Sequence, residues 1–291
     1  MTTTRSSPLV PRSDTSRGAR KVGRFFLSEL GLIMGRRRNQ AGLLVLAAMP
    51  VILGVAVRLT ESNPRGDGPP SFVDDIVGNG VFLAFAALTF ELTLFFPLAI
   101  AMVSGDAIAG EAHSGTLRYL LTVPAGRTRV LIVKYLGIVA GSFIAALTVT
   151  VVSALVGILL FGTGPLTTLS GDQISLGTGL WRLLISALYV AVGLCALGAL
   201  GLFVSTLTEQ PIAATVAVMI VTATMWVLDA IPQIAWLHPW LLVHHWTDFA
   251  ELMRNPPDFS GIGDGLLVAV GYAVVCLLAA WARFDGKDIT S

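Results

Sequence analysis

Charge and cysteine are both scarce in this sequence of 291 residues. Charged residues make up 13% of it and hydrophobic residues 54%, whereas a soluble globular domain carries roughly 25% charged residues. Together with a mean hydropathy of +0.78, this balance excludes an ordinary soluble domain and predicts a protein that lies within a lipid bilayer. Cys195 and Cys276 each lie inside an apolar run without CxxC or metal-ligand spacing, so they indicate nothing about the redox compartment.

Two further absences concern the ends of the chain. Residues 1–20 are rich in Thr, Ser, Arg and Pro and hold no apolar stretch, so they predict a disordered cytosolic tail and no secretory signal. No P-loop is present, because Gly286-Lys287 is followed by Asp288 and has Trp281 where the first glycine belongs. We therefore expect no ATP site and no bound cofactor in this chain.

Six apolar runs are long enough to cross a membrane. A bilayer core about 30 Å thick needs roughly 20 helical residues. Pro50 and Pro97 fall within the first two runs, which membrane helices tolerate. The sequence thus predicts an all-α membrane protein whose six-span domain covers residues 41–291. The spans lie at about 41–59, 81–103, 136–161, 183–203, 212–228 and 266–284.

Lysine and arginine are unevenly distributed between the loops. With a cytosolic N-terminus, 15 of the 19 fall on the inner side, which leaves outside only Arg58, Arg65, Arg182 and Arg254. Cytoplasmic loops carry an excess of these residues, so we expect a multi-pass protein of the cell membrane with both termini in the cytosol. Residues 21–40 place apolar side chains at helical spacing among basic ones, which predicts an amphipathic helix along the inner lipid interface or, alternatively, against a partner.

The inner loop between the second and third spans, from Ser104 to Arg127, holds the most specific pattern. Its second half predicts a short helix with Ser114 as N-cap and Pro124 as the stop. One face of this helix would carry leucines at i, i+3 and i+4, namely Leu117, Leu120 and Leu121. A helix that lies across the ends of two spans can transmit force, because a partner bound to its polar face pulls on both spans.

This loop resembles the type-2 family of ABC-transporter permeases. The family pattern is Asp, then Ile-Ala-Gly-Glu, three residues, Gly-Thr-Leu, two residues, Leu-Leu, a Pro soon after, then Arg and Lys. The residues that fill those places are Asp106, Ile108, Ala109, Gly110, Glu111, Gly115, Thr116, Leu117, Leu120, Leu121, Pro124, Arg127 and Lys134. The likeness covers nearly the whole chain through the span count, the helix before the first span and the inner loop 205–210, but only this loop is diagnostic.

The resemblance implies the permease subunit of an ATP-driven exporter, which is not itself an enzyme. In that family the loop looks like a coupling helix docked on a cytosolic ABC ATPase. The implied partners are two ATPase copies, a second permease copy, identical or related, and membrane lipid, while no nucleic acid is expected. Efflux is implied by the family alone, and an apolar pathway suits a drug, a lipid or another amphipathic compound without naming one.

The implied coupling residues are Asp106, Glu111, Gly115, Thr116, Arg118, Pro124 and Arg127. Carried over from the family, Glu111 would stabilise the bend into the helix and Gly115 would permit close approach of the ATPase. Arg118 and Arg127 would face the ATPase or the lipid headgroups. The alternative is that these charges are merely solvated at the interface.

Polar residues elsewhere in the chain are candidates for other roles. Glu91 is the one carboxylate near the middle of a span, where it could be hydrogen-bonded to a neighbouring helix or could bind a proton or a cationic substrate. The loop 232–260 is rich in Trp and holds His238 and the adjacent His244 and His245. Two neighbouring histidines without a third ligand at suitable spacing predict interfacial packing, so we expect no metal here.

A membrane-embedded enzyme, such as an intramembrane aspartyl protease, is the alternative function. Gly261-Ile-Gly-Asp264 matches the short signature of that class, with Asp229 as the imagined second carboxylate. Paired acids must meet at membrane depth, whereas both aspartates are predicted at the outer ends of spans. A secondary transporter is disfavoured, because only Glu91 is deeply placed and no inverted internal repeat is visible.

Overall fold

The structure, a computed structural model, describes residues 35, 37–61, 79–115, 127–164, 166–168 and 170–285. The predicted tail over 1–20 lies outside these residues, as does most of the predicted amphipathic helix over 21–40. Its last four residues form the first turn of α2. The second half of the diagnostic loop also lies outside, including Thr116, Arg118 and Pro124.

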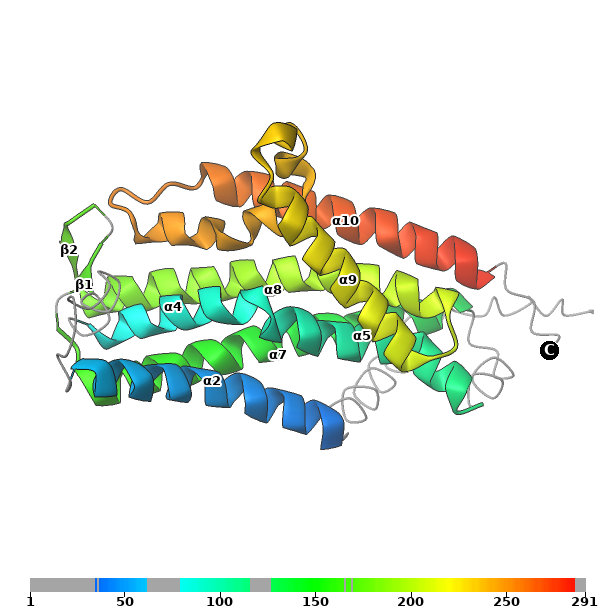
Figure 1. The fold of residues 1–291 in the computed structure, drawn as a ribbon, viewed down its shortest axis with the longest axis horizontal. Helices are drawn as coiled ribbons and strands as arrows, with labels where there is room; N and C mark the ends of the chain where they lie inside the picture. Colours follow the sequence, from blue (N-terminus) through cyan, green and yellow to red (C-terminus); the bar gives the residue numbers. More distant parts are fainter. Residues whose placement is uncertain are drawn as a thin grey trace, which may run out of the picture.

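The described part of the chain is a bundle of helices whose long axes run roughly together (Figure 1). Six helices are long and apolar enough to cross a membrane, which confirms the predicted number and the all-α class. A short antiparallel pair, β1 (Leu166–Thr167) and β2 (Gln173–Ile174), joins two of them. The helices are α2 (Arg37–Glu61), α4 (Gly80–Thr93), α5 (Phe95–His113), α7 (Arg127–Phe161), α8 (Leu176–Leu207), α9 (Pro211–Asp229) and α10 (Ser260–Asp285).

The apolar run over 81–103 is not a single helix. It falls on α4 and the first half of α5, which meet at Leu94 with φ −143° and ψ −49°. Pro97 is the third residue of α5, where the missing N–H would have no partner within the helix. In an unbroken helix, Pro97 would instead clash with the carbonyl of Thr93 and leave it without a donor. The break at Leu94 therefore accommodates this proline.

Helix α8 lies at the centre of the bundle. In its most apolar stretch 72% of the residues are buried, against 17% to 44% for the other five candidate spans. Glycines allow neighbouring helices to approach it closely: a Cβ at Gly201 would overlap Ser104 of α5, and one at Gly198 would overlap Ile138 of α7. The small residues of this span thus serve packing within the chain.

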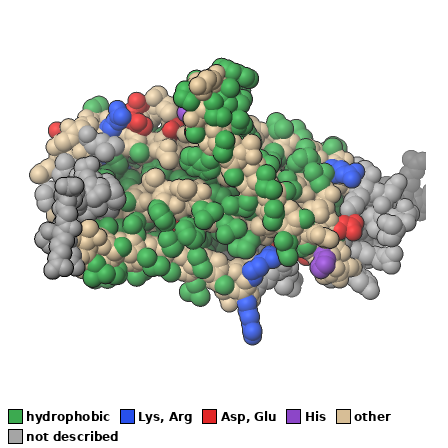
Figure 2. All heavy atoms as spheres, in the orientation of Figure 1, with side chains coloured by type: hydrophobic (Ala, Val, Ile, Leu, Met, Phe, Trp, Pro, Cys, Tyr) green, Lys and Arg blue, Asp and Glu red, His purple; other side chains and the backbone are tan. Residues whose placement is uncertain are grey.

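The outer surface is apolar over the middle of the bundle, as Figure 2 shows for one face. On α9 a stripe of large side chains is 50% to 77% exposed, namely Ile212, Val216, Ile220 and Val227. Such a surface is suited to lipid or to another apolar partner. After α9 the chain forms three 3-10 helices, η1 (Pro232–Ile234), η2 (His238–Trp240) and η3 (His244–Met253). The turns that directly follow α9 project from the bundle, whereas η3 lies along it and packs on α8 and α10, before α10 runs back along the bundle (Figure 1).

Candidate functional site

The first half of the diagnostic loop is the end of helix α5. Residues 104–113 continue the helix without interruption, so Asp106 and Glu111 are fixed on a rigid element. We call this end of the bundle, which holds His113 and the start of α7, the α5–α7 end. Asp106 forms an ion pair with Arg38 of α2, with 3.2 Å between Oδ2 and a guanidinium nitrogen. Arg38 also donates a hydrogen bond to the Met102 carbonyl.

Glu111 connects α5 to α7. Its Oε1 lies 3.1 Å from Nζ of Lys134, and the two side chains are only 16% and 8% exposed. Both residues belong to the pattern that resembles the permease family, so the structure brings two separated parts of that pattern into contact. This contact fastens the end of α5 to the next span. The bend that Glu111 is expected to stabilise lies outside the described residues.

Ser205 of α8 is a connection that the sequence did not reveal. Its hydroxyl accepts hydrogen bonds from the backbone N–H groups of Ile108 and Ala109, at 3.1 Å and 2.9 Å, and donates one to the Gly105 carbonyl at 2.7 Å. A side chain thus enters the backbone hydrogen-bond ladder of α5. The available signal was a serine at the end of an apolar run, which is too common to single out.

Gly115 ends the described part of the loop in a conformation that favours glycine. Its φ is +69°, and a Cβ added there would meet nothing within 4 Å. The requirement is therefore one of backbone conformation, since a left-handed residue with a side chain costs roughly 1–2 kcal/mol. Ser114, predicted as an N-cap, is the C-cap residue of α5, and its hydroxyl donates to the Gly110 carbonyl. Arg127 is the first residue of α7.

Glu91 lies near the end of α4, completely buried. Neither of its carboxylate oxygens has a hydrogen-bond partner among the described residues. A buried carboxyl group without partners is costly, and an ionisable residue within a span is a functional candidate. The hydrogen bond to a neighbouring helix that was one of its predicted roles is absent from the described part of the chain.

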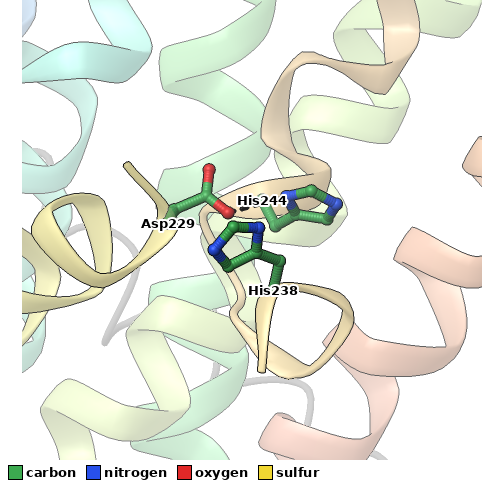
Figure 3. Close-up of side chains that lie close together, drawn as sticks. All are labelled: Asp229, His238 and His244. Carbon is green, nitrogen blue, oxygen red and sulfur yellow. Dashed lines mark hydrogen bonds and ion pairs between the residues drawn. The ribbon is translucent and has the colours of Figure 1, made fainter. Parts of the chain in front are cut away.

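A second polar cluster lies where α9 ends. Asp229 Oδ1 is 2.7 Å from Nδ1 of His244, and the His238 ring lies beside both (Figure 3). One ligand atom from each of these three residues lies within 4.8 Å of the others. His245 points elsewhere, toward Asp248 at 2.8 Å. The sequence put the two adjacent histidines forward as a pair, but the fold separates them and brings in a carboxylate from 15 residues upstream.

The imagined aspartate dyad finds no support in this arrangement. Asp229 is paired with His244, and Asp264 is exposed in the first turns of α10.

One known protein family matches nearly the whole chain. A sequence model described as ABC-2 family transporter protein matches residues 33–289. The chain belongs to this family. The six apolar helices and the family together fit a multi-pass membrane protein. Permeases of the ABC-2 family generally work with an ATPase partner.

Two curated relatives of this ABC-2 chain share a short segment with it. Both are named probable ABC transporter permease protein NosY, and each aligns over 52 residues. The protein from Pseudomonas aeruginosa is 46% identical there and that from Stutzerimonas stutzeri 42%. The aligned segment covers 18% of this chain and 19% of each relative, so the chain matches about a fifth of the length of these proteins.

Proposed function

We propose that this ABC-2 permease couples ATP hydrolysis by a separate ATPase subunit to the efflux of an amphipathic compound across the cell membrane. The observation that carries the proposal is the fastening of the α5 end to three spans at once. Asp106 pairs with α2, Glu111 pairs with α7, and Ser205 of α8 bonds to the α5 backbone. A force applied to the loop that follows Gly115 would thus reach the whole bundle.

The proposal includes an orientation and an assembly. In the proposed orientation the α5–α7 end faces the cytosol, because the Lys and Arg residues gather in the loops and termini assigned to that side. Two copies of a cytosolic ATPase dock there through residues 116–127, with Thr116, Arg118, Pro124 and Arg127 as coupling residues. A second permease copy, identical or related, completes the substrate pathway. This chain itself supplies no ATP site and no catalytic residue.

The proposal is tested by isolating the full chain from its native membrane through an affinity tag. A P-loop ATPase is expected to co-purify, and the reconstituted complex is expected to hydrolyse ATP and to move an amphipathic substrate outward. The purified chain alone should do neither. Hydrolysis-independent transport by the chain alone, or the absence of any ATPase from the preparation, would refute the coupling role.

Substitution of Gly115 sharpens this test. Gly115→Val is expected to distort the chain where it enters the coupling loop and to lower ATPase activity of the complex several-fold, because valine at a positive φ is strained. Gly171→Val is the matched control: Gly171 also has a positive φ, +84°, and open space around it, but it lies in the β1–β2 turn. Equal losses in both variants would show that the effect is general destabilisation.

A further inference from the structure

We infer that Asp229, His238 and His244 form a binding site for a divalent transition-metal ion of the Zn²⁺ class. The three residues come from the end of α9, from η2 and from the start of η3. Their ligand atoms already lie within 4.8 Å of one another. Two imidazoles and a carboxylate are the donor types that Zn²⁺ takes in open sites with three protein ligands.

The hydrogen bonds of the cluster fix which nitrogen of His238 is available. Its Nε2 lies 3.1 Å from the carbonyl oxygen of Ile231. A carbonyl only accepts, so Nε2 carries the hydrogen and the lone pair of the neutral ring lies on Nδ1. A histidine that binds metal through one nitrogen commonly donates its other N–H to a backbone carbonyl. His238 already has that arrangement.

The pair formed by His244 and Asp229 supplies the other two ligand atoms. The His244 Nδ1 and Asp229 Oδ1 atoms are 2.7 Å apart and are joined by a hydrogen bond. A metal ion bound between them needs a lone pair on each atom, so a neutral His244 must carry its hydrogen on Nε2. Bonds of about 2.1 Å in a tetrahedral site put ligand atoms about 3.4 Å apart. The side chains therefore shift by roughly 1 Å, which rotations about χ angles provide.

Exposure and ligand number define the kind of site. The His244 side chain is 39% exposed and that of Asp229 is 20% exposed, so an ion can enter from outside the bundle. Three protein ligands leave one coordination position for water or another donor. The bound ion ties the last residue of α9 to η2 and to the start of η3, and so restrains the turns that project between α9 and η3.

The test is metal binding by the full chain, purified through a tag without histidines and treated with a chelator. Titration with Zn²⁺ by calorimetry is expected to show about one ion per chain and a rise in Tm. Titration with Co²⁺ is expected to give the absorption bands of a low-symmetry site. Asp229→Asn, His238→Ala and His244→Ala should each weaken binding at least about tenfold, the loss typical even of residues that only support a ligand.

A matched control is available in the same segment. Asp248 pairs with His245 at 2.8 Å, as Asp229 does with His244, but it has no place in the three-residue cluster. Asp248→Asn should therefore leave the Zn²⁺ affinity unchanged. Asp229→Asn keeps the shape of the side chain, so it reports on the site even where an alanine variant fails to fold. Absence of saturable binding by the native chain, or equal affinity in the native chain and the Asp229→Asn variant, would overturn the site.

Discussion

Removal of the ammonium group of Lys134 is expected to loosen α5 from α7. Lys134→Met preserves the length of the side chain but leaves the Glu111 carboxylate, 16% exposed, without the cation that lies 3.1 Å away. Breaking a buried ion pair by removing one partner costs about 3–5 kcal/mol. Because Glu111 keeps some access to water, we expect the lower end of that range for the free energy of unfolding, about 3 kcal/mol.

The measurement is a double-mutant cycle on the chain in lipid nanodiscs, with thermal unfolding followed by tryptophan fluorescence. Lys134→Met, Glu111→Gln and the double variant give the coupling energy, expected at about 1–3 kcal/mol. The cycle for Arg38 and Asp106 is the control, since the Arg38 side chain is 45% exposed, and its coupling should stay below about 1 kcal/mol. Additive effects of the two substitutions at Glu111 and Lys134 would refute the role given to this pair.

Two further predictions concern buried polar groups. Ser205→Ala should lower stability by about 1–3 kcal/mol, because the α5 backbone loses one donor and one acceptor that tie it to α8. Ser186→Ala, whose hydroxyl donates to the Arg182 carbonyl of its own helix, should cost less, and equal falls in Tm would contradict this. Glu91→Gln should leave Tm unchanged or raise it, because the carboxyl has no partner among the described residues. Transport assays across a pH range then show whether the carboxyl binds a proton, and a marked fall in Tm would mean that it has partners.

The number and class of the spans could be predicted from the sequence because hydropathy over about 20 residues reports directly on the bilayer. The division of the second run could not, since hydropathy does not respond to φ and ψ. Pro97 was visible, but whether a membrane helix bends at a proline or ends just before it depends on how neighbouring helices pack. In the structure α4 packs mainly on α7, whereas α5 packs on α8 and α9.

The candidate site could also be predicted only in part from the sequence. The pattern from Asp106 to Lys134 located the α5–α7 end, because spacing along one chain is all that such a pattern needs. The partners of its charges were not predictable, since Arg38 and Glu111 meet their counterparts only after α2, α5 and α7 have packed. The cluster around Asp229 was missed for a related reason: consecutive 3-10 turns fold His238 and His244 back onto the helix that precedes them.

The break at Leu94 decides how the two half-helices respond to a change in length. A helix turns through about 100° for each residue. One residue removed from α5 between Leu94 and Asp106 would therefore rotate the upstream turns against the anchored end and strain the joint. The rotation caused by removing one residue from α4 would instead stop at Leu94, where the helical register is already lost. The break thus protects the charged end of α5 from the rotation caused by a one-residue insertion or deletion in α4. It gives no such protection against a change within α5 itself.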